Sequence, residues 1–293
     1  MRTVFLGTSE FAATVLRRLA ASPHRPSLVV TPPDSRRGRG RRELPPPAAA
    51  AATELGLPLL QSADANEQAA LARIRAANPA ALLVCAFGQL IREPLLSEFL
   101  PLNVHPSLLP RWRGAAPIER AIMAGDAETG TCVMRLTAGL DSGPVALREP
   151  VAIAADDDYA TLSARLAELG GELLVRALDL EEVGKLELRE QDDAAATYAE
   201  KIEPADRRID LSRPAAAEAD RVRALTPHVG AFLELVGGER LGVRRAHAAE
   251  RPEGPLTFAC GDGFLSLDLV QPPGGKPMEA AAYLRGHEPP VPA

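Results

Sequence analysis

Asn103 and His105 are the residues whose types and spacing first suggest chemistry. They stand two positions apart in a short run, residues 102–105, that has the pattern of a strand and ends at Pro106. Side chains two apart on a strand point to one face, so the amide and the imidazole would be presented together near the end of the strand. Both an amide N–H and an imidazolium N–H can donate to an oxyanion, as acyl transfer requires, and neither group is a good nucleophile. The pair therefore predicts oxyanion stabilisation.

The chain that follows this pair supports a functional role for it. The apolar run 108–110, Leu-Leu-Pro, leads into a basic turn, Arg-Trp-Arg, that ends at Gly114. An isolated Asn-x-His is more often structural, with both side chains hydrogen-bonded in a turn or core. Core packing alone does not require an apolar run that leads into a basic turn. This context therefore favours a functional role for Asn103 and His105.

Strand-like and helix-like runs alternate through the first part of the chain. We expect strands at 3–6, 27–31, 57–60 and 81–87, and helices at 11–19, 48–55 and 66–77 between them. This alternation is typical of a parallel sheet wrapped by helices. The run 81–86 is apolar throughout, as expected for a central strand buried on both faces. Open sheets of this type bind ligands beyond the carboxyl ends of their strands, so the loops after the strands are the candidate sites.

The later elements predict a second domain. We expect a helix at 115–124, strands at 102–105, 130–137 and 144–153, and a long helix from about 156 to 184. After a polar, aperiodic stretch, a helix at 215–225 precedes short strands separated by Gly- and Pro-rich turns, which predict a small β-barrel or partly open sheet. The predicted fold class is α/β. It has a Rossmann-like N-terminal domain with an open, parallel-type sheet over 1–185, a linker over 186–205, and a small OB-like β-barrel over 206–293.

Composition narrows the class of protein. The chain has 293 residues, of which 46% are hydrophobic, and a formal net charge of −6. Its three cysteines show no CxxC spacing, which argues against a disulfide framework or structural zinc. No apolar stretch approaches the roughly 20 residues that a membrane helix needs. We therefore expect a cytoplasmic protein, a monomer, with no metal and no membrane partner.

One charged segment departs from this acidic background. Residues 36–42 read Arg-Arg-Gly-Arg-Gly-Arg-Arg, so Arg36, Arg37, Arg39, Arg41 and Arg42 fall within seven positions. A solvated surface loop is the usual role of such a run. Guanidinium groups on a glycine-rich loop also suit phosphate contacts and stacking on unpaired bases, so a nucleic-acid partner is the alternative.

The segment around His105 resembles the signature of the folate-dependent formyltransferases. His105 precedes Ser-Leu-Leu-Pro at 107–110, Gly114 follows, and Arg-Gly-Ala-Ala-Pro-Ile at 113–118 extends the likeness. The resemblance also covers residues 5–12, 86–91 and 139–145.

This resemblance implies a third catalytic group, Asp141, which stands in the Asp-x-Gly segment of the family. A neutral amine would attack the formyl carbon of 10-formyltetrahydrofolate, while Asn103 and protonated His105 stabilise the oxyanion. Asp141 would orient His105 and help to remove the proton from the amine, without a metal. The resemblance further implies folate contacts from Ser107, Leu108, Leu109, Pro110, Phe87, Gly88, Leu90, Ile91, Gly139 and Leu140.

Several family members share this catalytic set, so the acceptor must be identified from other segments. Residues 7–11 lack the glycine-rich phosphate loop of the purine-pathway members. The arginine run with Pro-Pro-Pro at 45–47 resembles the insertion that enters the acceptor stem in members acting on methionyl-tRNA, and 223–227 and 271–278 resemble their C-terminal barrel. The resemblance therefore implies initiator methionyl-tRNA as the partner. The alternatives are a formyltransferase acting on a sugar-nucleotide amine and a catalytically silent RNA- or folate-binding protein.

Overall fold

The computed structural model describes residues 1–37 and 42–293. Contacts divide the chain into two compact units, neither of which is continuous in sequence. The first contains Met1–Gly114, Gly130–Val151 and Ser163–Tyr198, and the second contains Ala115–Thr129, Ala152–Leu162 and Ala199–Ala293.

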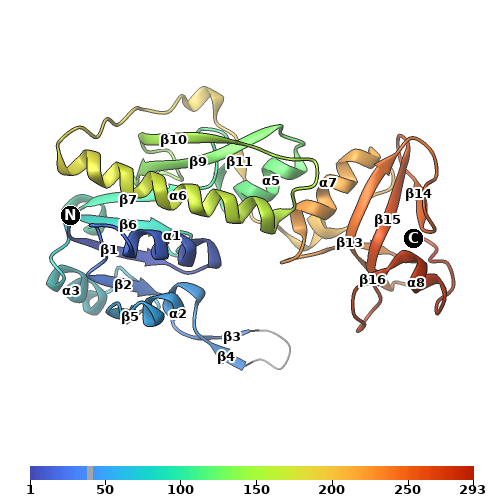
Figure 1. Cartoon of the computed structure of the whole chain (residues 1–293), viewed down its shortest axis with the longest axis horizontal. Helices are drawn as coiled ribbons and strands as arrows, with labels where there is room; N and C mark the ends of the chain where they lie inside the picture. The colour runs from blue at the N-terminus through green and yellow to red at the C-terminus, as the bar shows by residue number, and fades with distance from the viewer. Residues whose placement is uncertain (38–41) are drawn as a thin grey trace. The chain divides into compact units, whose positions relative to one another are not determined.

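The centre of the first unit is a seven-stranded sheet with the order β10-β9-β7-β6-β1-β2-β5 (Figure 1). Its strands are β1 (Thr3–Gly7), β2 (Leu28–Thr31), β5 (Leu59–Gln61), β6 (Ala81–Cys85), β7 (Leu100–His105), β9 (Glu128–Arg135) and β10 (Val145–Ala152). The pairs β2–β5, β1–β2, β1–β6 and β6–β7 are parallel, as the alternating pattern predicts. β6 ends two residues before its predicted end because Ala86 adopts the left-handed region, with φ of 42°.

The sheet is open and mostly parallel, as predicted, and the pairing of β9 makes it mixed. β9 pairs antiparallel with β7, with His105 opposite Cys132 and Leu102 opposite Arg135. β9 therefore starts beside the carboxyl end of β7 and runs back along it. Apolar periodicity gives no information on strand direction, so the sequence pattern could not distinguish the two arrangements.

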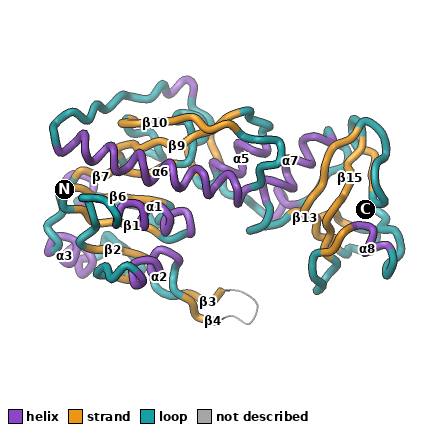
Figure 2. The backbone as a smooth tube through the Cα atoms, viewed as in Figure 1, coloured by secondary structure: helices purple, strands orange, loops and turns teal. Residues whose placement is uncertain are grey.

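Helices cover both faces of this sheet (Figure 2). They are α1 (Glu10–Ala20), α2 (Pro47–Glu54), α3 (Gln68–Ala76), α4 (Leu95–Glu98) and α6 (Tyr159–Glu182). Ile74 of α3 and Leu95 of α4 pack with the β-strand residues Leu6 and Leu82 in one buried cluster. On the other face, a Cβ added to Gly170 of α6 would lie 2.7 Å from Val104 of β7. The side chain of Val104 therefore points toward α6. Because successive side chains of a strand point to opposite faces, Asn103 and His105 point away from α6.

The arginine run begins and ends in strands. β3 (Ser35–Arg37) pairs antiparallel with β4 (Arg42–Leu44), where a loop was expected. Arg36 and Arg42 are exposed, whereas Arg39 and Arg41 lie outside the described residues.

The second unit contains an antiparallel sheet with the order β12-β13-β15-β14, and β16 pairs with β15. Its elements are α5 (Pro117–Met123), α7 (Ala215–Leu225), β12 (Ala231–Glu234), β13 (Arg240–Ala249), β14 (Thr257–Ala259), β15 (Phe264–Gln271), β16 (Met278–Glu279), α8 (Ala280–Leu284) and a 3-10 turn, Pro204–Arg207. Val222 and Leu225 of α7 pack on Leu241, Val243 and Leu265 of the sheet. The predicted antiparallel β domain is confirmed, in the form of a partly open sheet.

Candidate active site

β7 carries Asn103 and His105 to the carboxyl end of the sheet, as their spacing predicts. Their relative exposures are 8% and 4%, so both polar side chains are buried. Asn103 lies opposite Met134 and His105 opposite Cys132 in the register with β9, which places both on one face. Asp141, from the loop after β9, comes to the same strand end, with its Oδ2 3.7 Å from His105 Nδ1.

The imidazole of His105 lies between two acceptors. Its Nε2 is 2.8 Å from the carbonyl oxygen of Trp112. A carbonyl only accepts, so Nε2 must carry a hydrogen and donate it. Nδ1 faces the carboxylate of Asp141. Because 3.7 Å is longer than a hydrogen bond of about 2.7–3.2 Å, the Nδ1 atom makes no direct hydrogen bond to this carboxylate.

Separate donors hold the carboxylate of Asp141 and the backbone of its loop. The amide N–H of Gly114 donates to its Oδ2 at 2.9 Å. The side-chain amide of Gln191 donates to the carbonyl oxygens of Asp141 and Gly143, at 2.8 and 2.7 Å. Asp141 has φ of 45°, a region that non-glycine residues rarely adopt. The surrounding hydrogen bonds stabilise this backbone conformation.

Gln191 belongs to the stretch 186–205 that the sequence predicts as a linker. In the structure, the neighbouring Arg189 pairs with Val145 through N–H to O distances of 2.8 and 2.9 Å. Thr197 accepts from Trp112 N–H at 3.0 Å. This part of the stretch, which includes β11 (Tyr198–Ala199) and the 3-10 turn Asp193–Ala195, therefore contacts the site loops. The absence of glycine and proline from residues 186–203 was the available signal.

Arg113, on the short strand β8 (Arg113–Gly114), is buried, with 3% exposure. Its Nε donates to Gln191 Oε1 at 3.0 Å, and its Nη2 to Asp193 Oδ1 at 2.7 Å. Arg113 thus connects the turn after β7 to residues 191–193, and Gln191 in this segment also bonds to the Asp141 loop.

The predicted folate-contacting turn, residues 107–110, packs closely against β9. Ser107 is fully buried and donates its hydroxyl to Trp112 O at 3.4 Å. Leu109 is 1% exposed and packs on Cys132 and Met134. Burial raises the pKa of the Cys132 thiol to about 11, so it is a neutral thiol below the turn at pH 7. Ser107 and Leu109 help to build the turn, and their folate contacts stay a prediction.

The remaining predicted folate residues lie on two loops of the first unit. Phe87 is buried in the core, and its carbonyl oxygen accepts from the Thr8 hydroxyl at 2.6 Å. Leu90 and Leu140 are 69% and 59% exposed. Ile91 is half-buried, and Gly88 and Gly139 lie in the same two loops. These loops therefore offer apolar surface to a ligand.

Gly130 on β9 controls how closely the 107–110 turn packs. A Cβ added there would overlap the carbonyl oxygen of Glu149 and lie 2.5 Å from Leu108 Cδ2. We expect Gly130→Ala to lower the free energy of unfolding by about 1–3 kcal/mol, measured by urea denaturation. The control is Gly286→Ala, because an added Cβ there meets nothing within 4 Å. Equal stability of the two variants would contradict the close packing.

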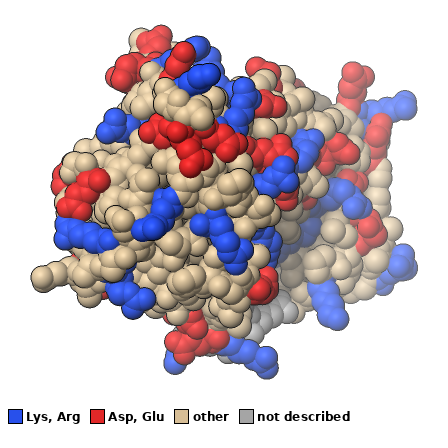
Figure 3. Space-filling view, turned by 60° about the vertical axis from the view of Figure 1, so that its left-hand side comes forward, with Lys and Arg blue, Asp and Glu red and all other residues tan. Residues whose placement is uncertain are grey.

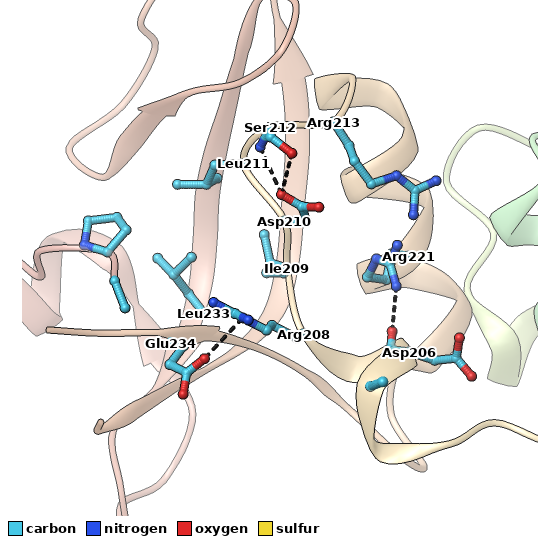
Figure 4. A pocket seen from close by; sticks show the side chains of 13 residues that line it. Asp206, Arg208, Ile209, Asp210, Leu211, Ser212, Arg213, Arg221, Leu233 and Glu234 are labelled. Carbon is cyan, nitrogen blue, oxygen red and sulfur yellow. Dashed lines mark hydrogen bonds and ion pairs between the residues drawn. The ribbon is translucent and has the colours of Figure 1, made fainter. Parts of the chain in front are cut away.

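The second unit contains a separate pocket of about 670 Å³ (Figure 4). Several of its polar groups are bonded to one another: Arg208 pairs with Glu234 at 3.0 Å, and Ser212 donates to Asp210 at 2.6 Å. Arg221 donates to the carbonyl oxygen of Asp206 at 2.7 Å. The predicted site residues are not among those that line this pocket.

Metal-binding clusters and membrane-spanning helices are both absent from the described part of the chain. No group of three or more His, Cys, Asp or Glu side chains there could hold a metal ion. No described helix is long and apolar enough to cross a membrane.

The first unit is an α/β domain of the transferase class, with the buried polar side chains of Asn103 and His105 at a strand end. Residues 1–178 match the family model of formyl transferase, and residues 201–288 match that of its C-terminal domain. The chain therefore belongs to the formyl transferase family. Curated relatives include the methionyl-tRNA formyltransferases of Pseudomonas paraeruginosa, 42% identical over 96% of this chain and 94% of the relative, and of Cereibacter sphaeroides, 41% identical over 98% and 96%.

A solved structure extends the likeness of the fold. HypX from Aquifex aeolicus in complex with tetrahydrofolic acid aligns with a TM-score of 0.69 over 97% of this chain and 47% of that protein. The sequence identity is 16%, so this likeness concerns the fold alone.

Proposed function

We propose that the chain transfers the formyl group of 10-formyltetrahydrofolate to the free amino group of methionyl-initiator tRNA, for translation initiation. The observation that carries this proposal is the 42% identity to a methionyl-tRNA formyltransferase over 96% of the chain. The chain acts as a monomer in the cytoplasm, where translation supplies its acceptor.

The site supports a direct transfer in which no bond forms to the protein. The amine lone pair attacks the formyl carbon, and the oxyanion accepts from the Asn103 amide and from His105. Because Nε2 of His105 is occupied by the Trp112 carbonyl, the donor is Nδ1–H. Asp141 removes the amine proton, directly or through water, the bond between the formyl carbon and N10 breaks, and N10 takes up a proton.

Folate is proposed to bind along the loops next to this site. Ser107, Leu108, Leu109 and Pro110 would contact it, with the pterin between Phe87, Gly88, Leu90 and Ile91 on one loop and Gly139 and Leu140 on the other. The exposed side chains of Leu90 and Leu140 support this assignment, because an aromatic ring system gains from covering apolar surface.

The tRNA is proposed to contact Arg36, Arg37, Arg39, Arg41 and Arg42. On the face shown in Figure 3, acidic and basic side chains are intermixed. In the sequence, by contrast, residues 36–42 hold five arginines and no acidic residue. Residues 1–185 would form the catalytic domain, 186–205 the connection, and 206–293 an OB-like domain that adds tRNA contacts.

The test is a formyl-transfer assay on the full chain, with 10-formyltetrahydrofolate as donor. Charged initiator tRNA is offered against amino-sugar nucleotides, and N-acetylmethionyl-tRNA, which has no free amine, is the control. We expect transfer to the charged tRNA with a kcat/KM at least about 100-fold higher than to the sugar. Formylation of the sugar alone would overturn the proposal.

A further inference from the structure

Gln191 makes three hydrogen bonds with one side-chain amide. Its two N–H donors reach the carbonyl oxygens of Asp141 and Gly143, at 2.8 and 2.7 Å. Its Oε1 accepts from Nε of the buried Arg113 at 3.0 Å. The amide thus connects the Asp141 loop to the turn after β7, over sequence separations of about 50 and 78 residues.

The orientation of this amide is determined by its partners. A rotation of 180° would place the amide oxygen against two carbonyl oxygens and the NH₂ group against a guanidinium. Both arrangements are repulsive, so the observed orientation is the one that satisfies all groups. Gln191 therefore acts specifically as a donor to the Asp141 loop and an acceptor for Arg113.

The Asp141 loop needs such support because of its backbone conformation. Asp141 has φ of 45°, and such residues persist where their surroundings fix them. The two bonds from Gln191 hold the carbonyls on either side of Ser142, and Gly114 N–H fixes the carboxylate itself at 2.9 Å. Without Gln191, the peptide unit that follows Asp141 loses its side-chain donor, and the carboxylate loses its fixed place beside His105.

We propose that Gln191 is a positioning residue for the transfer step, which acts by keeping the Asp141 carboxylate beside His105. This inference rests on the proposed function, which assigns the proton transfer to Asp141. All three hydrogen bonds of the Gln191 amide are made to the protein, so we expect its removal to affect turnover rather than binding.

Two variants of Gln191 separate its donor and acceptor roles. Gln191→Met has similar length and removes all three bonds, whereas Gln191→Glu retains the acceptor for Arg113 and loses the donors. We expect kcat to fall roughly 10- to 100-fold in both, with KM for each substrate within about threefold, since a displacement near 1 Å costs about that much. The control is Asp193→Asn, which loses the ionic partner of Arg113 and leaves Gln191 intact, with kcat within about twofold. A normal kcat for Gln191→Glu would overturn the proposal.

A double-mutant cycle tests whether the effect passes through Asp141. In the Asp141→Asn background, Gln191→Met should lower the residual kcat by less than about twofold, because the group that it positions is already gone. A further fall equal to that in the wild-type background would mean a general structural role and would overturn the proposal.

A measurement that needs no turnover distinguishes a failure of this inference from a failure of the proposed function. The imidazole ¹H–¹⁵N signals of His105, assigned with a His105→Gln variant, respond to the neighbouring carboxylate at fixed pH. In Gln191→Met they should move toward their positions in Asp141→Asn. If the wild-type chain transferred no formyl group but these signals moved, the function would fail and the positioning role would stand. Unchanged signals in a folded Gln191→Met variant would refute the positioning role.

Discussion

Replacing Asp141 by asparagine is expected to lower kcat for formyl transfer by about 10²- to 10⁴-fold, the range for removal of a proton-transfer group. An asparagine still accepts from Gly114 N–H, and the bonds from Gln191 to the backbone are unaffected, so the loop stays in place. The variant lacks the negative charge 3.7 Å from His105 Nδ1 and the base for the amine proton. The measurement is single-turnover transfer to charged tRNA.

Folate affinity is the control for this variant. Asp141→Asn should bind a reduced folate within about threefold of the wild-type Kd, because the carboxylate is assigned to proton transfer. A catalytically silent binding protein predicts no functional change in this variant. An unchanged rate in an active preparation would therefore remove Asp141 from the mechanism.

Replacing Arg36, Arg37, Arg39, Arg41 and Arg42 by serine is expected to lower kcat/KM for charged tRNA by about 10³-fold or more. Each arginine–phosphate interaction that the variant removes should also reduce the slope of log(kcat/KM) against log salt concentration, by roughly 0.7 if the RNA at that point is single-stranded. The wild-type rate should thus fall steeply with salt, and the variant rate should fall less steeply. Folate binding should be unchanged.

A control variant with three surface arginines replaced separates local interactions from overall charge. Arg17, Arg18 and Arg75 are half-exposed and pair with glutamates on the surface of the first unit. Their replacement by serine should change kcat/KM for tRNA by less than about threefold. If this control fell in activity as far as the first variant, net charge would explain the effect and the run at 36–42 would have no specific role.

Local pattern was sufficient for much of the fold. Short-range apolar periodicity predicted β1, β2, β6 and β7 and their helices within a few residues, and turn residues predicted the antiparallel strands of the second unit. Strand alternation also placed Asn103 and His105 on one face. These features depend on residues two to four positions apart in the chain, so they can be predicted from the sequence alone.

Other features depend on contacts between distant segments, for which periodicity gives no signal. The direction of β9, the Trp112 carbonyl on His105 Nε2, and the placement of residues 189–197 against the site loops are of this kind. Asp141 was identified by resemblance, and folding brings it to 3.7 Å from a histidine 36 residues away. The sequence by itself determined the family and the chemical groups available. The tertiary structure decided which nitrogen of His105 bonds to the Trp112 carbonyl and that Gln191 bonds to the Asp141 loop, because hydrogen-bond partners are set by proximity in space.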